Sequence, residues 1–195
     1  MNESLLLWIN QGWHTPQLDI FFTWLSEKST FSFPLLALII LILGFRYGKS
    51  GWVLGFLMLL VAGTGDLLGS FLKSTFAHPR PCLEYWEQIR MPYTESVRCM
   101  SSESGMPSNH ALNFFATFSF LSFFMRHHIF IIFSIILCTF VGISRIYLGQ
   151  HFPTQVLSGA LIGTVYGLAI AMICRYYLDK KINNLLSIFT KQNGK

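Results

Sequence analysis

Charged residues are scarce in this sequence. Asp, Glu, Lys and Arg together make up 12% of its 195 residues, whereas 52% of the residues are apolar. A soluble globular domain usually carries about twice that share of charge. The composition therefore argues against a soluble protein.

A continuous basic stripe is also absent, although the net charge is +5. Nucleic-acid-binding proteins gather Lys and Arg on one face or along one helix. Here the basic residues form separate clusters beside apolar runs, which is typical of the flanks of membrane segments. We therefore exclude nucleic acid as a partner.

The first residues, Met-Asn-Glu-Ser, lack the basic region of a cleavable signal peptide, and no small-residue cleavage site follows. Residues 3–13 instead place Trp8 and Trp13 among polar side chains, which predicts a helix lying in the membrane interface. Thr15-Pro16 ends this helix. The mixed segment 18–25 is either a second interfacial helix or the outer end of the first span.

Long apolar runs are what the sequence has in abundance. Because about 20 apolar residues cross a hydrocarbon core of about 30 Å, the sequence predicts an all-α, polytopic membrane helix bundle. We expect five or six spans. Five are clear and lie at residues 31–45, 52–76, 108–124, 129–148 and 154–176. The expected organisation is N-terminal interfacial helices over 1–30, a membrane-embedded core over 31–176, and a basic tail over 177–195.

The distribution of Lys and Arg predicts the orientation. One side holds the turns at 46–49 and 126–128 and the C-terminal tail, and it carries most of the basic residues, so we assign it to the cytoplasm. Its basic residues are Arg46, Lys49, Arg126, Arg175, Lys180, Lys181, Lys191 and Lys195. The opposite side has Lys28, Arg90 and Arg98, besides Lys73, Arg80 and Arg145, which we assign to the site. Every candidate site residue then lies at the outer face.

Residues 144–155 form the most distinctive stretch, because Arg145 closes a long apolar run and His151 stands just before the next. The guanidinium of an Arg is a planar fork that suits phosphate oxygens. An imidazole can attack phosphorus or transfer a proton near neutral pH. Pro153 has the backbone angle of a first helical turn. We therefore expect His151 to lie at a helix N-terminus, where an anion is stabilised.

Two further stretches carry the same kind of chemistry at the ends of spans. Lys73 precedes Arg80-Pro81, and Pro107-Ser-Asn-His110 opens the third span. In chain order, Lys-x6-Arg-Pro, Pro-Ser-x-His and Ser-Arg-x5-His resemble the three signatures of the type 2 phosphatidic acid phosphatase and vanadium haloperoxidase superfamily.

The resemblance implies a role for each matching residue. His151 would be the nucleophile that forms a phosphohistidine, and His110 the general acid that protonates the leaving oxygen. The phosphoryl oxygens would be bound by Lys73, Arg80, Arg145, Ser108 and the main-chain N–H of Asn109. Positive charge around three phosphoryl oxygens is what phosphoryl transfer requires. No metal or other cofactor is implied.

Gln155 departs from the family's common pattern, which has Asp four residues after the nucleophilic histidine. His-Phe-Pro-x-Gln also resembles the glucose-6-phosphatase and dolichyl-diphosphatase branches, where Gln fills this place. On a helix start, the Gln155 amide oxygen could accept a hydrogen bond from the His151 ring and orient it. The alternative is that Pro153 turns Gln155 away from the ring. Asn109, often Gly in the family, is a mild departure because the main chain binds there.

Other polar residues have plainer interpretations. Asp66 lies inside the second span, where a carboxylate usually needs a partner, so we favour a structural hydrogen bond or ion pair over a catalytic role. Lys73 and Arg145 could be interfacial anchors only, but their pairing with two histidines argues against that. We interpret the remaining histidines as surface or interface residues: His14, His78, His127 and His128.

The four cysteines lie in two kinds of segment. Cys138 and Cys174 lie within spans, whereas Cys82 and Cys99 lie in the outer loop. In an oxidising periplasm Cys82 and Cys99 can form a disulfide that holds Arg80 and Ser108 in one geometry. The alternative is two free thiols.

These features predict an integral membrane lipid-phosphate phosphatase of the bacterial inner membrane, with its site facing the periplasm. Fitting substrates are undecaprenyl diphosphate, lipid A 1-phosphate, phosphatidylglycerol phosphate and phosphatidic acid. The alternatives are a lipid phosphotransferase with the same intermediate, and a non-catalytic lipid-binding or transport protein. A binder would need the cations but not the acid His110.

Overall fold

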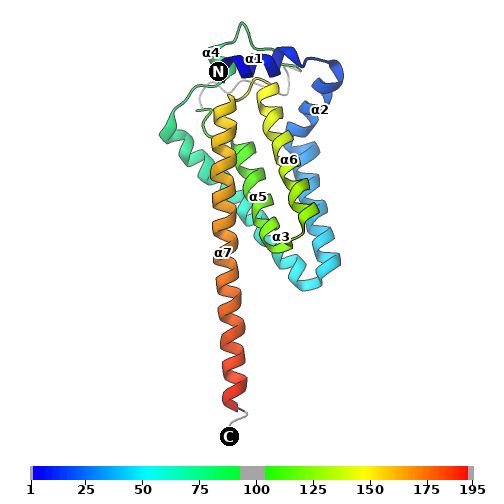
Figure 1. The fold of residues 1–195 in the computed structure, drawn as a ribbon, viewed down its shortest axis with the longest axis vertical. Coiled ribbons are helices and arrows are strands. Elements are labelled where there is room, and N and C mark those ends of the chain that lie inside the picture. The colour runs from blue at the N-terminus through cyan, green and yellow to red at the C-terminus, as the bar shows by residue number, and fades with distance from the viewer. Residues whose placement is uncertain (1, 93–103, 193–195) are drawn as a thin grey trace.

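The structure, a computed structural model, describes residues 2–92 and 104–192, with side chains up to Leu178 in the last helix. Every regular element in these ranges is a helix, as predicted (Figure 1). The elements are α1 (Asn2–Gly12), α2 (Pro16–Ser26), the π-helical turn η1 (Lys28–Ser32), α3 (Phe33–Phe76), α4 (Pro81–Glu84), α5 (Asn109–Met125), α6 (His128–Tyr147) and α7 (Pro153–Gln192).

Helix α3 is a hairpin of two helical arms. Gly48 has φ 58° and ψ −135°, a conformation that favours glycine, and the chain reverses there. The position of Gly55 on the second arm faces Ile40 on the first, so the arms run antiparallel (Figure 1). The predicted turn at 46–49 is confirmed, and the two arms correspond to the first two expected spans.

Three stretches of the described chain are long and apolar enough to cross a membrane: Lys28–Glu84, which contains the α3 hairpin, His128–Tyr147 and Pro153–Leu178. Helix α5 has 17 residues. Large apolar side chains cover the outer faces; Leu67 is 71% exposed and Ile129 is 72% exposed. Such a surface suits lipid rather than water. The count of five crossings and the domain limits stay predictions.

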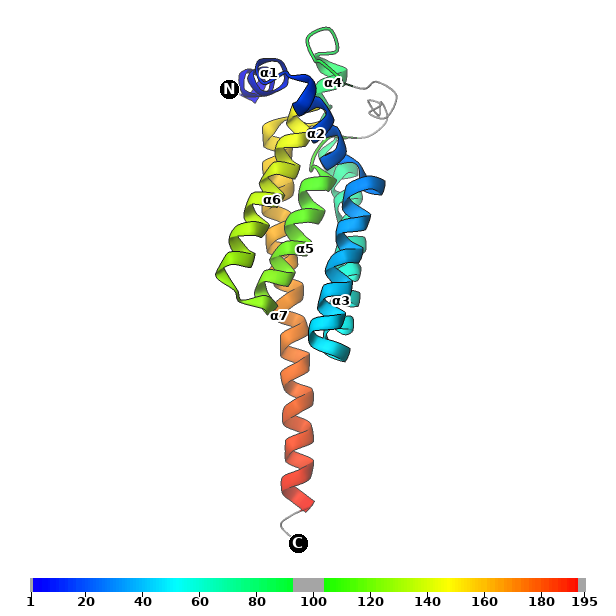
Figure 2. The ribbon, with the colours of Figure 1, turned by 90° about the vertical axis from the view of Figure 1, so that its right-hand side faces the viewer.

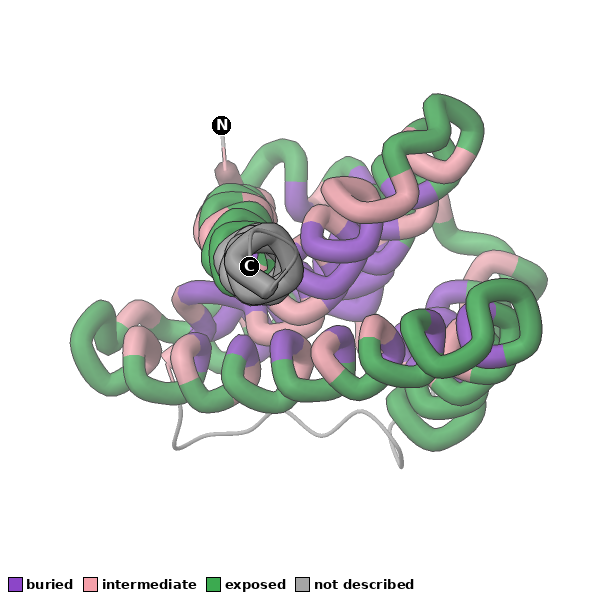
Figure 3. Tube along the Cα trace, turned by 90° about the horizontal axis from the view of Figure 1, so that it is seen from below, coloured by how far each residue is buried: buried purple, intermediate pink, exposed green. Residues whose placement is uncertain are grey.

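Helix α5 is the centre of the bundle and packs against α3, α6 and α7 (Figure 2). Seen from below, the buried residues gather where these helices meet (Figure 3). Gly159, Gly163 and Gly167 lie one turn apart on α7, and a methyl group at Gly163 would stand 2.2 Å from the Leu112 carbonyl oxygen. Small residues let the two backbones approach closely.

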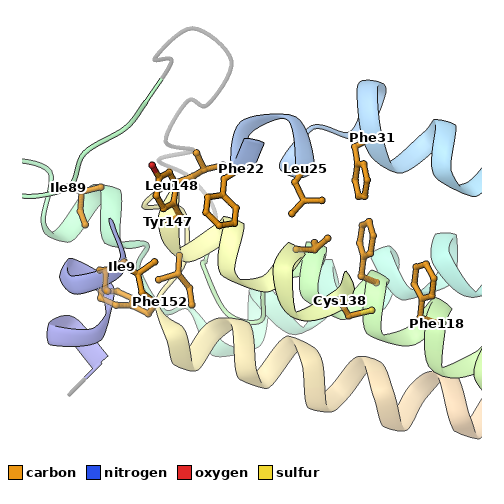
Figure 4. Close-up of a cluster of buried hydrophobic side chains, with 14 residues drawn as sticks. Ile9, Phe22, Leu25, Phe31, Ile89, Phe118, Cys138, Tyr147, Leu148 and Phe152 are labelled. Atoms are coloured by element: carbon orange, nitrogen blue, oxygen red, sulfur yellow. The ribbon is translucent and has the colours of Figure 1, made fainter. Parts of the chain in front are cut away.

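An apolar cluster runs along the bundle to the end at which α1 lies, which we call the outer end after the predicted orientation (Figure 4). It brings Ile9 of α1 and Phe22 of α2 against Tyr147, Leu148 and Phe152, at the end of α6 and the loop after it. This packing fixes the loop that carries His151.

Helix α1 lies across the outer end of the bundle (Figures 1 and 2) and is anchored by polar bonds. The buried side chain of Asn10 donates to the carbonyl oxygens of Arg90 and Tyr147, at 2.8 and 2.6 Å, and accepts from the Arg90 N–H at 2.9 Å. Arg90 in turn pairs with Asp19 of α2 at 2.7 Å. The N-terminal helices are therefore tied to the end of α6.

Candidate active site

The predicted site residues converge at the outer end of the bundle, although five elements supply them (Figure 1). Lys73 lies in the last turn of α3, Arg80 just before α4, and Ser108 just before α5. Arg145 lies in the last turn of α6, and His151 two residues before α7. Except for the half-buried Lys73, these side chains are at most 9% exposed.

The loop between α6 and α7 holds His151 close to Arg145. The main-chain N–H groups of Gln150 and His151 both donate to the Arg145 carbonyl oxygen, at 3.0 and 3.1 Å. Gly149, with φ 68°, ends the helix in the left-handed conformation that favours glycine. The chain then turns into Pro153, the first residue of α7 as predicted.

The ring of His151 is oriented through Nδ1. This atom lies 2.9 Å from the Gly105 carbonyl oxygen and 3.2 Å from Gln155 Oε1. Both partners are acceptors, so Nδ1 carries the hydrogen and Nε2 keeps its lone pair. The predicted contact between Gln155 and His151 is therefore present, and Nε2 has the electronic form of a nucleophile.

The surroundings keep His151 neutral. Burial and, after it, the charges of Arg145, Arg80 and Lys73 hold the pKa of His151 well below its usual range, while the hydrogen bond with Gln155 acts in the opposite direction. The three cations therefore lie close enough to this imidazole to act on its charge. A neutral imidazole among cations suits attack on an anionic phosphoryl group.

Gln155 ties α7 to the segment after α3. Its oxygen also accepts from the Phe152 N–H at 3.1 Å, and its Nε2 donates to the Pro79 carbonyl oxygen at 2.8 Å and contacts His78 Nδ1 at 3.0 Å. His78, which we interpreted as a surface or interface residue, thus contacts Gln155 beside the nucleophile. His78 is half-buried because its segment folds back onto the site, where the Gly105 N–H donates to its carbonyl oxygen.

Unpaired donors are buried in the site. Arg145 Nη1 donates to the Ser26 hydroxyl, but Arg145 Nε has no acceptor among the described residues. The Ser108 hydroxyl also has no hydrogen-bond partner among these residues. A buried donor without a partner is costly, and more so for a charged group. Asn109, as the first residue of α5, adds a main-chain N–H of the kind a helix start leaves unbonded. An anion would satisfy these donors together.

His110 and Asp66 meet different partners. His110 Nε2 lies 3.1 Å from the Ser26 carbonyl oxygen. Asp66 Oδ1 accepts from the side-chain amides of Asn109 and Asn113, at 3.3 and 3.0 Å, so the predicted structural hydrogen bond is present. Asp66 thus joins α3 to the start of α5.

A cavity of about 380 Å³ adjoins the site between the two arms of α3 and α5. Its wall is mainly apolar, with side chains such as Leu36, Leu59 and Phe118, and it also includes His110 and Asp66. Of the candidate site residues, Asn109 and His110 line this cavity, whereas His151 and the three cations do not.

Two contacts of the site were missed by the sequence analysis. Ser26 lies far from every motif, and Gly105 contacts His151 through a main-chain carbonyl oxygen. No pattern in the sequence marks either one. Of the cysteines, Cys82 is disulfide-bonded, whereas Cys138 and Cys174 are free. Cys99, its expected partner, lies outside the described residues, so that pairing stays a prediction.

Comparison with known proteins gives consistent matches. Residues 50–179, which contain all three motifs, match the PAP2 superfamily. Phosphatidylglycerophosphatase B of Bacillus subtilis is 32% identical over 158 residues, 76% of this chain and 71% of that protein. Lipid A 4'-phosphatase of Bacteroides thetaiotaomicron is 26% identical over 201 residues, 100% of this chain and 84% of that protein.

Two crystal structures share the fold. A transmembrane PAP2-type phosphatidylglycerolphosphate phosphatase from Bacillus subtilis has a TM-score of 0.65 and 27% identity, and the match covers 92% of this chain and 87% of that one. Aquifex aeolicus LpxE has a TM-score of 0.61 and 27% identity, with 88% and 94% covered. The predicted membrane helix bundle is confirmed.

Proposed function

The chain belongs to the PAP2 superfamily, and from this we propose that it is an integral membrane phosphatase acting on a lipid phosphate through a phosphohistidine on His151. One observation carries the proposal: a neutral, oriented His151 lies among the buried cations Arg145 and Arg80, and the Arg145 guanidinium has no carboxylate partner among the described residues. Such a cluster is arranged for an anionic group that reacts with the imidazole.

The reaction has two steps. His151 Nε2 uses its lone pair to form an N–P bond while the bond from phosphorus to the lipid oxygen breaks, and the leaving oxygen takes a proton from His110. Water then attacks phosphorus and gives a proton to His110 as the N–P bond breaks. The electron pair returns to Nε2, and inorganic phosphate is released. Arg145, Arg80 and Lys73 stabilise the charge on the phosphoryl oxygens in both steps.

The cavity beside His110 supports an amphiphilic substrate, because a lipid chain can occupy its apolar wall while the phosphate reaches the cations. The relatives are named for phosphatidylglycerol phosphate and lipid A. Those two lipid phosphates are therefore the first substrates to test, followed by undecaprenyl diphosphate and phosphatidic acid. The excess of basic residues at the opposite end supports a bacterial inner-membrane protein whose site faces the periplasm.

The test is release of inorganic phosphate by the purified full-length protein from the four lipids. We expect release from at least one lipid and its loss in His151→Ala. His128→Ala, an exposed histidine at the other end of the bundle, is the matched control and should keep the wild-type rate. Release that survives in His151→Ala, or no release from any lipid, would overturn the proposal. Phosphate found on a second lipid instead of in solution would assign a phosphotransferase.

The same four lipids test the role of His110 as the general acid. His110→Ala should lose more activity on a monophosphate lipid than on a diphosphate lipid, because a phosphate leaving group needs less protonation than an alkoxide. Equal losses on both lipid types would remove His110 from the general-acid role while leaving the nucleophile untouched.

A further inference from the structure

Ser26 lies where the N-terminal helices break. It is the last residue of α2, and Glu27 after it has extended angles, φ −84° and ψ 127°. The π-helical bonds that follow begin at the Glu27 carbonyl, so the Ser26 carbonyl belongs to neither helix's hydrogen-bond ladder. Short π-helical turns of this kind are frequent at functional sites.

Both polar groups of Ser26 are used inside the site. Its carbonyl oxygen lies 3.1 Å from His110 Nε2, and its hydroxyl accepts from Arg145 Nη1. Ser26 is 7% exposed, so water does not compete freely for either contact. One residue of α2 thus touches candidate site residues on both α5 and α6.

We propose that Ser26 is a positioning residue, which aims the Arg145 guanidinium through its hydroxyl and orients the His110 ring through its carbonyl. The inference rests on the proposed function. It adds a residue that lies outside both the three motifs and the matched range 50–179.

The contact with Arg145 leaves one edge of the guanidinium available. Nη1 is occupied by Ser26, whereas Nε has no acceptor among the described residues. Nε and Nη2 form the edge that binds two oxygens of a phosphate side by side. Ser26 therefore turns the bidentate edge of Arg145 toward the phosphoryl group.

The contact with His110 selects the atom that carries the transferable proton. A carbonyl can only accept, so Nε2 carries a hydrogen that stays with Ser26. Protonated His110 then offers its second proton at Nδ1. Ser26, at the helix break, thus orients both the general acid His110 and the phosphate-binding Arg145.

A double-mutant cycle tests the hydroxyl. In the full-length protein, Ser26→Ala should raise the inhibition constant of inorganic phosphate and the KM of the lipid about 10-fold, since it removes a hydrogen bond to a charged group. Ser26→Thr keeps the hydroxyl and should restore most of the affinity. Ser134→Ala, a buried serine of α6 bonded to the Phe130 carbonyl, is the matched control and should change neither value.

The second half of the cycle places Ser26→Ala in an Arg145→Lys background. If Ser26 acts through the guanidinium, the substitution should have little further effect there. An equal effect in both backgrounds, or a Ser26→Ala variant that matches Ser134→Ala, would overturn the proposal. Ser26→Cys, similar in size but a weak acceptor, repeats the comparison if Ser26→Ala unfolds.

The two proposals fail differently. If the wild type releases no phosphate from any lipid, the proposed function is wrong. If the wild type is active and Ser26→Ala is as active at every phosphate concentration, only the role of Ser26 is wrong.

Discussion

His151 is a nucleophile whose protonation is set by its neighbours. Its pKa lies well below the usual 6.5 because of burial and the cations around it, so the imidazole keeps its lone pair at neutral pH. Activity that depends on a neutral His151 is lost only as the pH falls through this lowered pKa. We therefore expect the acid limb of the kcat/KM profile to lie below pH 6.5.

Gln155→Glu should shift the acid limb of the kcat/KM profile to higher pH. A carboxylate beside Nδ1 stabilises the imidazolium, which raises the pKa of His151 and shifts the acid limb to higher pH. The rate should also fall, because the new oxygen would face the Pro79 carbonyl, which now accepts from Gln155 Nε2 at 2.8 Å. The measurement is kcat/KM against pH for both proteins.

Gln155→Leu is the companion variant. It removes one of the two acceptors at Nδ1 but leaves Gly105, so we expect a loss of about 10- to 100-fold, by analogy with residues that orient metal-bound histidines. A Glu profile that coincides with the wild type, together with a fully active Leu variant, would show that Gln155 does not influence the nucleophile.

At the scale of elements, the contact between α5 and α7 should tolerate little added volume. Gly163→Ala places a methyl 2.2 Å from the Leu112 carbonyl oxygen, so one backbone must move. Overpacking of this kind costs about 1–3 kcal/mol, and helices α5 and α7 carry His110 and Gln155. We expect a lower Tm and lower activity.

Gly63→Ala is the matched control for that substitution. Gly63 also lies inside an apolar helix, but nothing stands within 4 Å of the added methyl. Its Tm should equal or exceed the wild-type value, because Ala favours a helix over Gly by about 1 kcal/mol. Equal Tm values for the two variants, measured in the same detergent, would mean that the α5–α7 contact is loosely packed.

The glycines of α3 do not all act alike. Gly65 and Gly69 face the side-chain oxygens of Asn113 and Asn109 on α5, as close helix contact requires, whereas Gly63 faces open space. Gly63 lines the cavity between α3 and α5, so no side chain stands close to it.

For the whole molecule, the predicted orientation can be tested with a membrane-impermeant thiol reagent on intact spheroplasts. A cysteine at position 87, exposed beside the site, should be labelled, because that end is expected to face the periplasm. A cysteine at position 127, exposed in the turn between α5 and α6, should be labelled only after the membrane is permeabilised. The reverse pattern would place the site in the cytoplasm and rule out periplasmic substrates.

The membrane character of the chain and the chemistry of its site follow from the sequence alone. Apolar runs can satisfy their backbone only as helices in lipid, and Gly48 and Pro153 set local angles wherever they occur. Arg145 and His151 stood out because a charged and an imidazole side chain flank long apolar runs, whereas the role of His110 came from the resemblance of its motif to the superfamily. Each of these properties depends on residue type and local spacing.

The partners of those residues depend on packing instead. Ser26 meets His110 across 84 positions and Arg145 across 119, and Gly105 meets His151 across 46. Two of these contacts use main-chain carbonyl oxygens, which every residue possesses and which no sequence pattern distinguishes. Which carbonyl reaches a histidine ring is determined by where helices break and how closely they pack.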